Sequence, residues 1–67
     1  KGELMNKKLT PKQIRNMAGF TQVDIAEKLG LSTTTYVLKE MGKSRFYFDE
    51  IKKLCEITGF PIDKVEI

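Results

Sequence analysis

A series of short segments, each opened by a helix-capping residue and closed by a glycine, constrains the fold of this sequence more than any other feature. Thr10 begins the first, because its hydroxyl can accept a helical N–H, and Pro11 follows where its missing donor costs nothing. Gly19 supplies the left-handed residue that ends a helix. The pattern predicts a helix over about 11–18. Its expected core-facing residues are Ile14, Met17 and Ala18.

The same signals recur at once and predict a helix over 22–29 that ends at Gly30. Only Leu31 separates this glycine from the next cap, Ser32, which opens a predicted helix over about 33–41. Two helices joined by so short a turn cannot lie antiparallel, so we expect them to cross steeply.

A fourth helix is predicted over about 48–58, where apolar residues recur at helical spacing. The segment 45–48, just before it, has strand propensity but no partner strand, so we interpret its aromatic residues as an anchor on a loop. One last short turn is expected at about 61–65. The predicted fold class is therefore all-α, a compact four- to five-helix bundle.

Length and composition limit what such a bundle can do. A chain of 67 residues forms one domain at most, with a small core and no deep catalytic cleft. We expect residues 1–8 to be a flexible leader and 9–67 to be the domain. The absence of histidine and the single cysteine exclude zinc clusters, histidine-dependent triads and an intrachain disulfide. The carboxylates are scattered, so we expect no enzyme, no metal and no cofactor.

The net charge of +3 is unevenly distributed along the chain. Residues 1–20 carry five cations and one anion, whereas residues 46–67 carry three cations and five anions. A basic first part attracts a polyanion such as nucleic acid, and a solvated lysine face is the alternative. Apolar runs fall far short of the about 20 residues that span a bilayer. We therefore expect a cytoplasmic protein that does not enter membranes.

The functional signal lies in residues 21–43, TQVDIAEKLGLSTTTYVLKEMGK. Where two helices cross tightly, the contact residue of the first must be small, and Ala26 satisfies this requirement. Gly30, four residues later, permits the turn, and Tyr36 then faces back into the core. A structural αα-corner shares these features, but the polar row after the turn favours a DNA-binding helix-turn-helix.

Over about residues 9–65 the sequence resembles the lambda-repressor/Cro (XRE-type) family of helix-turn-helix proteins. The resemblance implies a lambda repressor-like bundle whose third helix enters the DNA major groove. The pattern Thr-Tyr-x-x-x-Glu-x-Gly-Lys-Ser at 35–44, with an aromatic residue soon after it, also resembles small regulators of Gram-positive bacteria and their temperate phages. The matching features are the Thr-Gln at 21–22, Ala26, Gly30, Ser32, the Glu40-x-Gly42-Lys43 end of the third helix, and the closing segment 59–65.

The resemblance also implies which residues contact DNA. Thr33, Thr34 and Leu38 occupy base-reading positions, where threonine offers a hydroxyl or a methyl group and leucine only an apolar contact. Packing of Leu38 or Val37 against the aromatic loop is the alternative. The positions that the resemblance places at DNA phosphates are Gln22, Ser32, Thr35, Lys43 and Arg45. For the two cations among them, Lys43 and Arg45, the alternative is a solvated loop without a DNA contact.

Other positions are expected to support the fold. The family pairs an arginine of the first helix with a glutamate of the third, and the matching residues are Arg15 and Glu40. Lys39 stands where the family usually has an apolar residue, which indicates that this helix is turned or less buried there. Tyr47 replaces the usual small cap of the fourth helix, and burial of the aromatic cluster 46–48 is expected to offset that loss. Cys55 is expected in the core.

Modules of this family bind as dimers on half-sites, so we expect a weak homodimer that forms mainly on DNA. Candidate contacts are Phe60, Ile62, Val65 and Ile67, with core packing as the alternative for the first three. Two functions remain open. One is a Cro-like or repressor-like transcriptional regulator of double-stranded DNA. The other is a protein-binding module, such as an antirepressor, modulator or antitoxin-like protein, that uses Val37 and Leu38 to hold a partner regulator.

Overall fold

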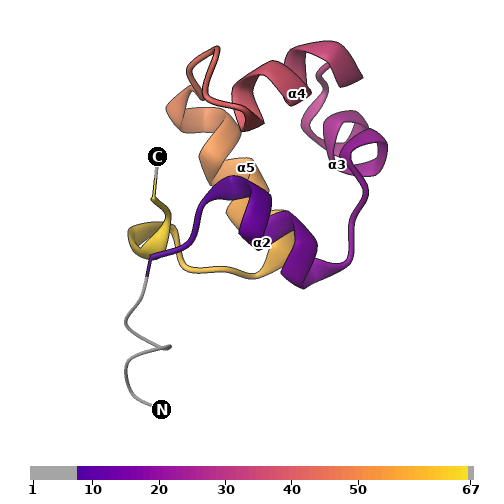
Figure 1. The fold of residues 1–67 in the computed structure, drawn as a ribbon. Coiled ribbons are helices and arrows are strands. Elements are labelled where there is room, and N and C mark those ends of the chain that lie inside the picture. Colours follow the sequence, from indigo (N-terminus) through magenta and orange to yellow (C-terminus); the bar gives the residue numbers. More distant parts are fainter. Residues whose placement is uncertain (1–7, 67) are drawn as a thin grey trace.

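The computed structural model describes residues 8–66, and these form four α-helices and one short 3-10 turn (Figure 1). No regular strand occurs within that range, so the predicted all-α class is confirmed. Most of the expected leader, residues 1–7, lies outside the described residues. The elements are α2 (Pro11–Ala18), α3 (Gln22–Leu29), α4 (Thr33–Glu40), α5 (Phe48–Thr58) and the 3-10 turn η1 (Ile62–Lys64).

The helix boundaries follow the local sequence signals. Thr10 accepts the N–H of Gln13 at 3.3 Å while the Gln13 side chain accepts the N–H of Thr10 at 2.9 Å, which completes the predicted capping box of α2. Thr21 caps α3 by accepting the N–H of Asp24 at 3.1 Å. The predicted limits of α2, α3 and α5 are confirmed, and α4 ends one residue earlier than expected, at Glu40.

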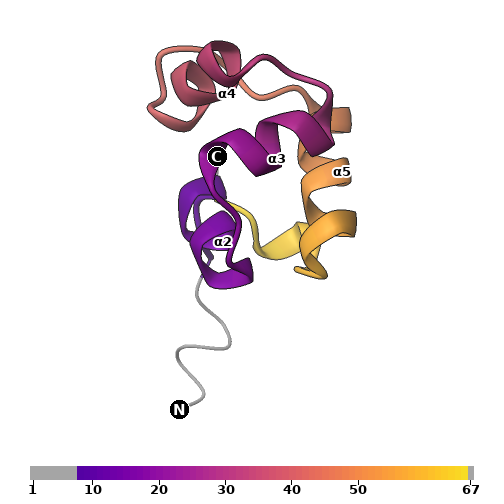
Figure 2. The ribbon, with the colours of Figure 1, turned by 90° about the vertical axis from the view of Figure 1, so that its right-hand side faces the viewer.

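The helices are arranged so that α4 forms one outer edge of the molecule. It crosses α3 steeply after the turn at Gly30 and lies at the end opposite η1, as two perpendicular views show (Figures 1 and 2). Below it, α5 packs against both α2 and α3. One side of α4 therefore covers the core while the other faces outward.

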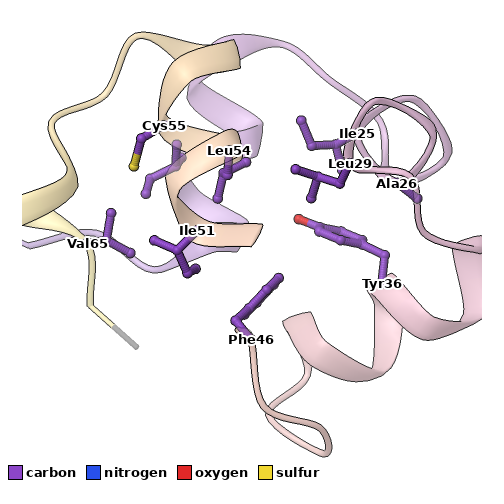
Figure 3. Close-up of a cluster of buried hydrophobic side chains, with 10 residues drawn as sticks. Ile25, Ala26, Leu29, Tyr36, Phe46, Ile51, Leu54, Cys55 and Val65 are labelled. Carbon is purple, nitrogen blue, oxygen red and sulfur yellow. The ribbon is translucent and has the colours of Figure 1, made fainter. Parts of the chain in front are cut away.

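The core fills the space between these helices (Figure 3). Tyr36 points inward from α4, is fully buried, and meets the ring of Phe46 edge-on with centroids 5.9 Å apart. Phe46 thus anchors the loop after α4, as predicted. The segments before α2 and after η1 meet in an isolated parallel bridge. The N–H of Leu9 donates to the carbonyl of Lys64, and the carbonyl of Leu9 accepts the N–H of Glu66.

Some packing predictions were wrong. Met17 is 68% exposed and Ala18 is also exposed, so α2 buries Pro11 and Arg15 beside Ile14 instead. Arg15 is buried because its guanidinium finds hydrogen-bond partners inside the bundle, described below, whereas Met17 and Ala18 border a small surface pocket beside Phe60 after α5.

The aromatic cluster also differs from expectation. Phe46 alone is buried, while Tyr47 and Phe48 are exposed, the latter by 73%. Tyr47 makes no side-chain capping bond, but the carboxylate of Glu50 accepts its N–H at 2.9 Å. The start of α5 is therefore supported by a carboxylate three residues into the helix and not by aromatic burial. No helix within residues 8–66 has the length and apolar character needed to cross a membrane.

Candidate nucleic-acid interface

The turn between α3 and α4 is built on one left-handed residue. Gly30 has φ +76°, a conformation that costs glycine little, and the N–H of Leu31 donates to the carbonyl of Ala26 at 2.9 Å. Ala26 itself is buried, so the two helices approach without a bulky side chain between them. This geometry fixes the direction in which α4 leaves the turn.

The start of α4 presents hydroxyl groups to solvent. Thr33, Thr34 and Thr35 are all exposed. Ser32 caps the helix by accepting the N–H of Thr35 at 3.1 Å and donates its own proton to the Thr35 hydroxyl oxygen at 2.8 Å. In this arrangement the Ser32 hydroxyl proton is used within the cap, and the Thr35 hydroxyl can donate its own proton to another partner. The start of α4 therefore carries exposed hydroxyl groups that can donate and accept hydrogen bonds.

Leu38 continues this face of α4 by one turn. It lies four residues after Thr34, the spacing that places two side chains on the same side of a helix, and it is 39% exposed. Val37 is half-buried. The outer face thus carries hydroxyl groups at its start and an apolar group further along.

Two cations follow on the loop after α4. Lys43 and Arg45 are both exposed. The loop begins at Gly42, with φ +83°, and the N–H groups of Lys43 and Ser44 both donate to the carbonyl of Leu38, at 2.9 and 3.2 Å. The backbone of this loop is therefore tied to the end of α4 beside the exposed face.

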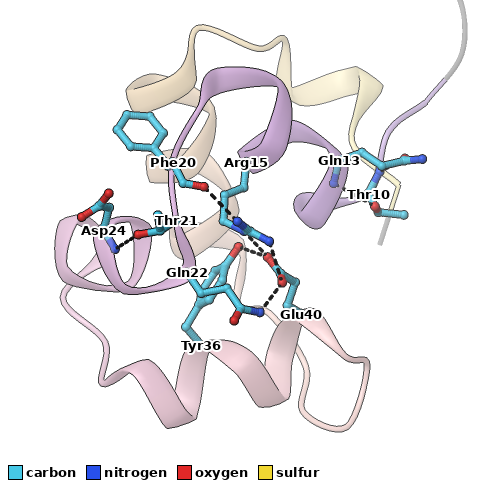
Figure 4. A network of polar contacts seen from close by, with 9 residues as sticks. All are labelled: Thr10, Gln13, Arg15, Phe20, Thr21, Gln22, Asp24, Tyr36 and Glu40. Carbon is cyan, nitrogen blue, oxygen red and sulfur yellow. Dashed lines mark hydrogen bonds and ion pairs between the residues drawn. The ribbon is translucent and has the colours of Figure 1, made fainter.

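A polar network joins α2, α3 and α4 on the inner side (Figure 4). The carboxylate of Glu40 accepts two hydrogen bonds from Arg15, at 2.7 and 3.3 Å, and one from the hydroxyl of Tyr36 at 2.6 Å. A fourth comes from the amide of Gln22 at 2.8 Å. Arg15 also donates to the carbonyl of Phe20 at 2.8 Å. These bonds hold α4 against the two helices before it.

The network changes the acidity of its members. Burial acts to raise the pKa of Glu40, but hydrogen bonds from Arg15, Tyr36 and Gln22 outweigh it, so that pKa lies below the ordinary value. The hydrogen bond to Glu40 raises the pKa of Arg15. Burial, followed by the hydrogen bond to Glu40, raises the pKa of Tyr36 well above that of a free phenol. The carboxylate is therefore held ionised and the phenol neutral.

The sequence pattern missed two members of this network. Tyr36 was expected only as an apolar core residue, and its hydroxyl role follows from a spacing of four residues to Glu40, which could have indicated it. Gln22 was expected at a phosphate, yet its amide N–H reaches Glu40. The structure brings Arg15 and Glu40 together as a buried pair, with 9% and 2% of their side chains exposed.

Lys39 is buried, so the expectation of a less buried helix at this position was wrong. Its ammonium group donates to the carbonyl of Arg45 at 2.9 Å and pairs with Glu50 at 3.0 Å. It also lies 4.3 Å from the centre of the Tyr47 ring. Three partners thus surround one buried cation, and all three belong to the loop or to the start of α5.

The candidate dimer residues lie at the opposite end of the molecule. Val65 is buried in the core, and Phe60 is half-buried against it. Ile62 is exposed and borders a shallow groove with Phe48 and Phe60. Ile67 lies outside the described residues.

Among residues 8–66, no group of three or more potential ligand side chains could hold a metal ion. Cys55 is buried in the core, as expected, and burial raises the pKa of its thiol.

A family model described as helix-turn-helix (HTH_3) matches residues 12–65. The match runs from α2 through η1 and so includes the turn at Gly30, the exposed face of α4 and the loop with both cations. No curated protein and no solved structure matches the chain.

Proposed function

The chain belongs to the XRE-type helix-turn-helix family, and from that premise we propose that it is a sequence-specific regulator of transcription that binds double-stranded DNA through α4. The observation that carries the proposal is the outer face of α4, whose exposed hydroxyl groups are followed directly by two exposed cations. Members of this family are DNA-binding regulators rather than enzymes. A cytoplasmic location goes with such a target.

In the proposed complex, the start of α4 enters the major groove. Thr33 and Thr34 contact base edges or thymine methyl groups, and Leu38 makes an apolar contact one turn further along. Binding at a promoter then blocks access to it, as expected for a Cro-like or repressor-like protein.

The phosphate contacts are assigned to residues around this edge. Lys43 and Arg45 bind the strands as exposed cations, and Thr35 donates through its hydroxyl. Gln22 at the start of α3 keeps one amide proton for a phosphate after donating the other to Glu40. Ser32 acts mainly as the cap, with its backbone N–H left to face the strand.

A salt titration with duplex DNA of random sequence tests the proposal. If phosphate contacts dominate binding, the logarithm of the binding constant must fall linearly with the logarithm of the salt concentration, because binding releases counterions from the DNA. Lys43→Ala should weaken binding to all sequences alike and reduce the slope by about one unit. Lys53→Ala, an exposed lysine on α5, is the control and should leave the slope nearly unchanged. Affinity that does not respond to salt would contradict the proposal.

A second candidate function rests on the apolar end of α4. Leu38 and Met41 are both exposed there, which suits contact with another protein better than a solvated surface. In this case the chain is a modulator that holds a partner regulator. Salt-insensitive binding of that partner, lost in Leu38→Asp, would favour it over DNA binding.

We also propose that the protein forms a weak homodimer, mainly on DNA, through the half-buried Phe60 and the exposed Ile62. Sedimentation of the protein alone and with a duplex carrying two half-sites measures this directly. Ile62→Asp should abolish the two-copy complex and leave single-copy binding intact.

A further inference from the structure

Lys39 is a buried cation that neither the helix-turn-helix packing nor the proposed DNA contacts require. Its side chain is 6% exposed, and an apolar residue would fill the same position at lower cost in desolvation. Its ammonium group nevertheless has three partners, since it donates to the carbonyl of Arg45, pairs with the carboxylate of Glu50 and lies over the ring of Tyr47. Because a buried charge is costly without its partners, these three groups must stay close to the Lys39 ammonium group.

The three partners fix the loop that carries the exposed cations. Arg45 is held by its backbone carbonyl, so its side chain is left to face outward. Glu50 pairs with the Lys39 ammonium at 3.0 Å and accepts the N–H of Tyr47 at 2.9 Å, which connects α4, the loop and α5 at one carboxylate. The other end of the loop is fixed where Lys43 donates its N–H to the carbonyl of Leu38.

We propose that Lys39 and Glu50 form a brace that positions Lys43 and Arg45 for the DNA phosphates. Neither residue of the brace touches DNA; both act through the loop, as positioning residues. This inference rests on the proposed function for its DNA readout. The brace itself is open to test in the protein alone.

Glu50→Ala tests the brace against simple electrostatics. Loss of this carboxylate raises the net charge from +3 to +4, so charge alone predicts tighter binding to DNA. The brace predicts the opposite, about fivefold weaker binding to random duplex, because the loop cations lose their fixed position. Glu56→Ala makes the same charge change at an exposed site of α5 and should bind equally well or slightly more tightly.

A second measurement follows the loop without DNA. Amide hydrogen exchange should become faster at Lys43 and Ser44 in Glu50→Ala, while amides in the middle of α3 keep their protection. In a background with Lys43→Ala and Arg45→Ala, Glu50→Ala should change DNA affinity less than twofold, since the residues it positions are gone. If Glu50→Ala does not fold, the double variant Lys39→Met, Glu50→Gln serves for all three measurements, because it removes both buried charges together and keeps the net charge at +3.

The possible results separate the two proposals. Unchanged exchange in the loop, or unchanged affinity despite faster exchange, would overturn the brace and leave DNA binding standing. Failure of the unsubstituted protein to bind any duplex would overturn the proposed function, and the exchange experiment would still decide whether the brace exists.

Discussion

At the scale of single residues, Glu40 has the largest structural role. Four hydrogen bonds from α2, α3 and α4 meet at its two carboxylate oxygens. The pairing with Arg15 could be expected from the family resemblance. The resemblance assigns Gln22 to a phosphate and so does not indicate its bond to Glu40. The hydroxyl role of Tyr36 is indicated only by its spacing of four residues from Glu40.

Glu40→Gln should destabilise the fold strongly. The substitution removes the charge that balances the buried Arg15, and leaving one partner of a buried pair uncompensated costs about 3 kcal/mol. That is comparable to the whole net stability of about 3–5 kcal/mol expected for a domain of this size. Urea unfolding measures the loss. Glu27→Gln, on the exposed side of α3, should change the free energy of unfolding by no more than about 0.5 kcal/mol.

The same carboxylate should make the free energy of unfolding depend on pH. Burial opposes ionisation of Glu40, but its hydrogen bonds prevail and its pKa in the folded protein lies below the ordinary value of about 4.3. Its contribution to stability is therefore complete above that ordinary value and is lost as pH falls through the lowered pKa. The difference in unfolding free energy between the unsubstituted protein and Glu40→Gln should narrow between pH 7 and pH 3. A difference that stays constant would show that Glu40 is not held ionised.

At the scale of elements, the capping residues and glycines predicted where the helices begin and end. The spacing of apolar residues was a poorer guide to which face of each helix is buried. The signals that begin and end a helix lie within a few residues of one another, so α2, α3 and α5 have the limits expected from sequence. Burial depends on distant partners. Arg15 and Lys39 are buried because of residues 25 and 11 positions away, Glu40 and Glu50, and no local pattern contains that information.

The backbone conformation at the turn between α3 and α4 determines how much a substitution of Gly30 should cost. Nothing lies within 4 Å of a β-carbon built there, so the cost of Gly30→Ala comes only from the left-handed backbone, about 1 kcal/mol. Gly30→Asn should cost less, because asparagine tolerates this conformation. Thermal unfolding of both variants checks the order. Equal losses for alanine and asparagine would point to a steric cause instead.

At the scale of the whole molecule, the two proposed contact surfaces lie at opposite ends. In Figure 1, α4 and the loop after it lie at one end and η1 lies at the other. The exposed Ile62 is the first residue of η1. The bridge between Leu9 and Val65 joins the first and last parts of residues 8–66, which sequence could not reveal because a single bridge has no strand pattern. The proposed DNA contact at one end therefore leaves the proposed dimer contact at the other end accessible.

The central claim is that the exposed start of α4 reads base sequence. Selection of bound molecules from a pool of random duplexes tests it most directly, with the unsubstituted protein compared with Thr34→Val, which keeps a methyl group and loses the hydroxyl. The account predicts one enriched site for the unsubstituted protein and relaxed preference at about one base pair, worth about 1–3 kcal/mol, for the variant. A pool without enrichment, or the same site with the same preference in both proteins, would contradict it.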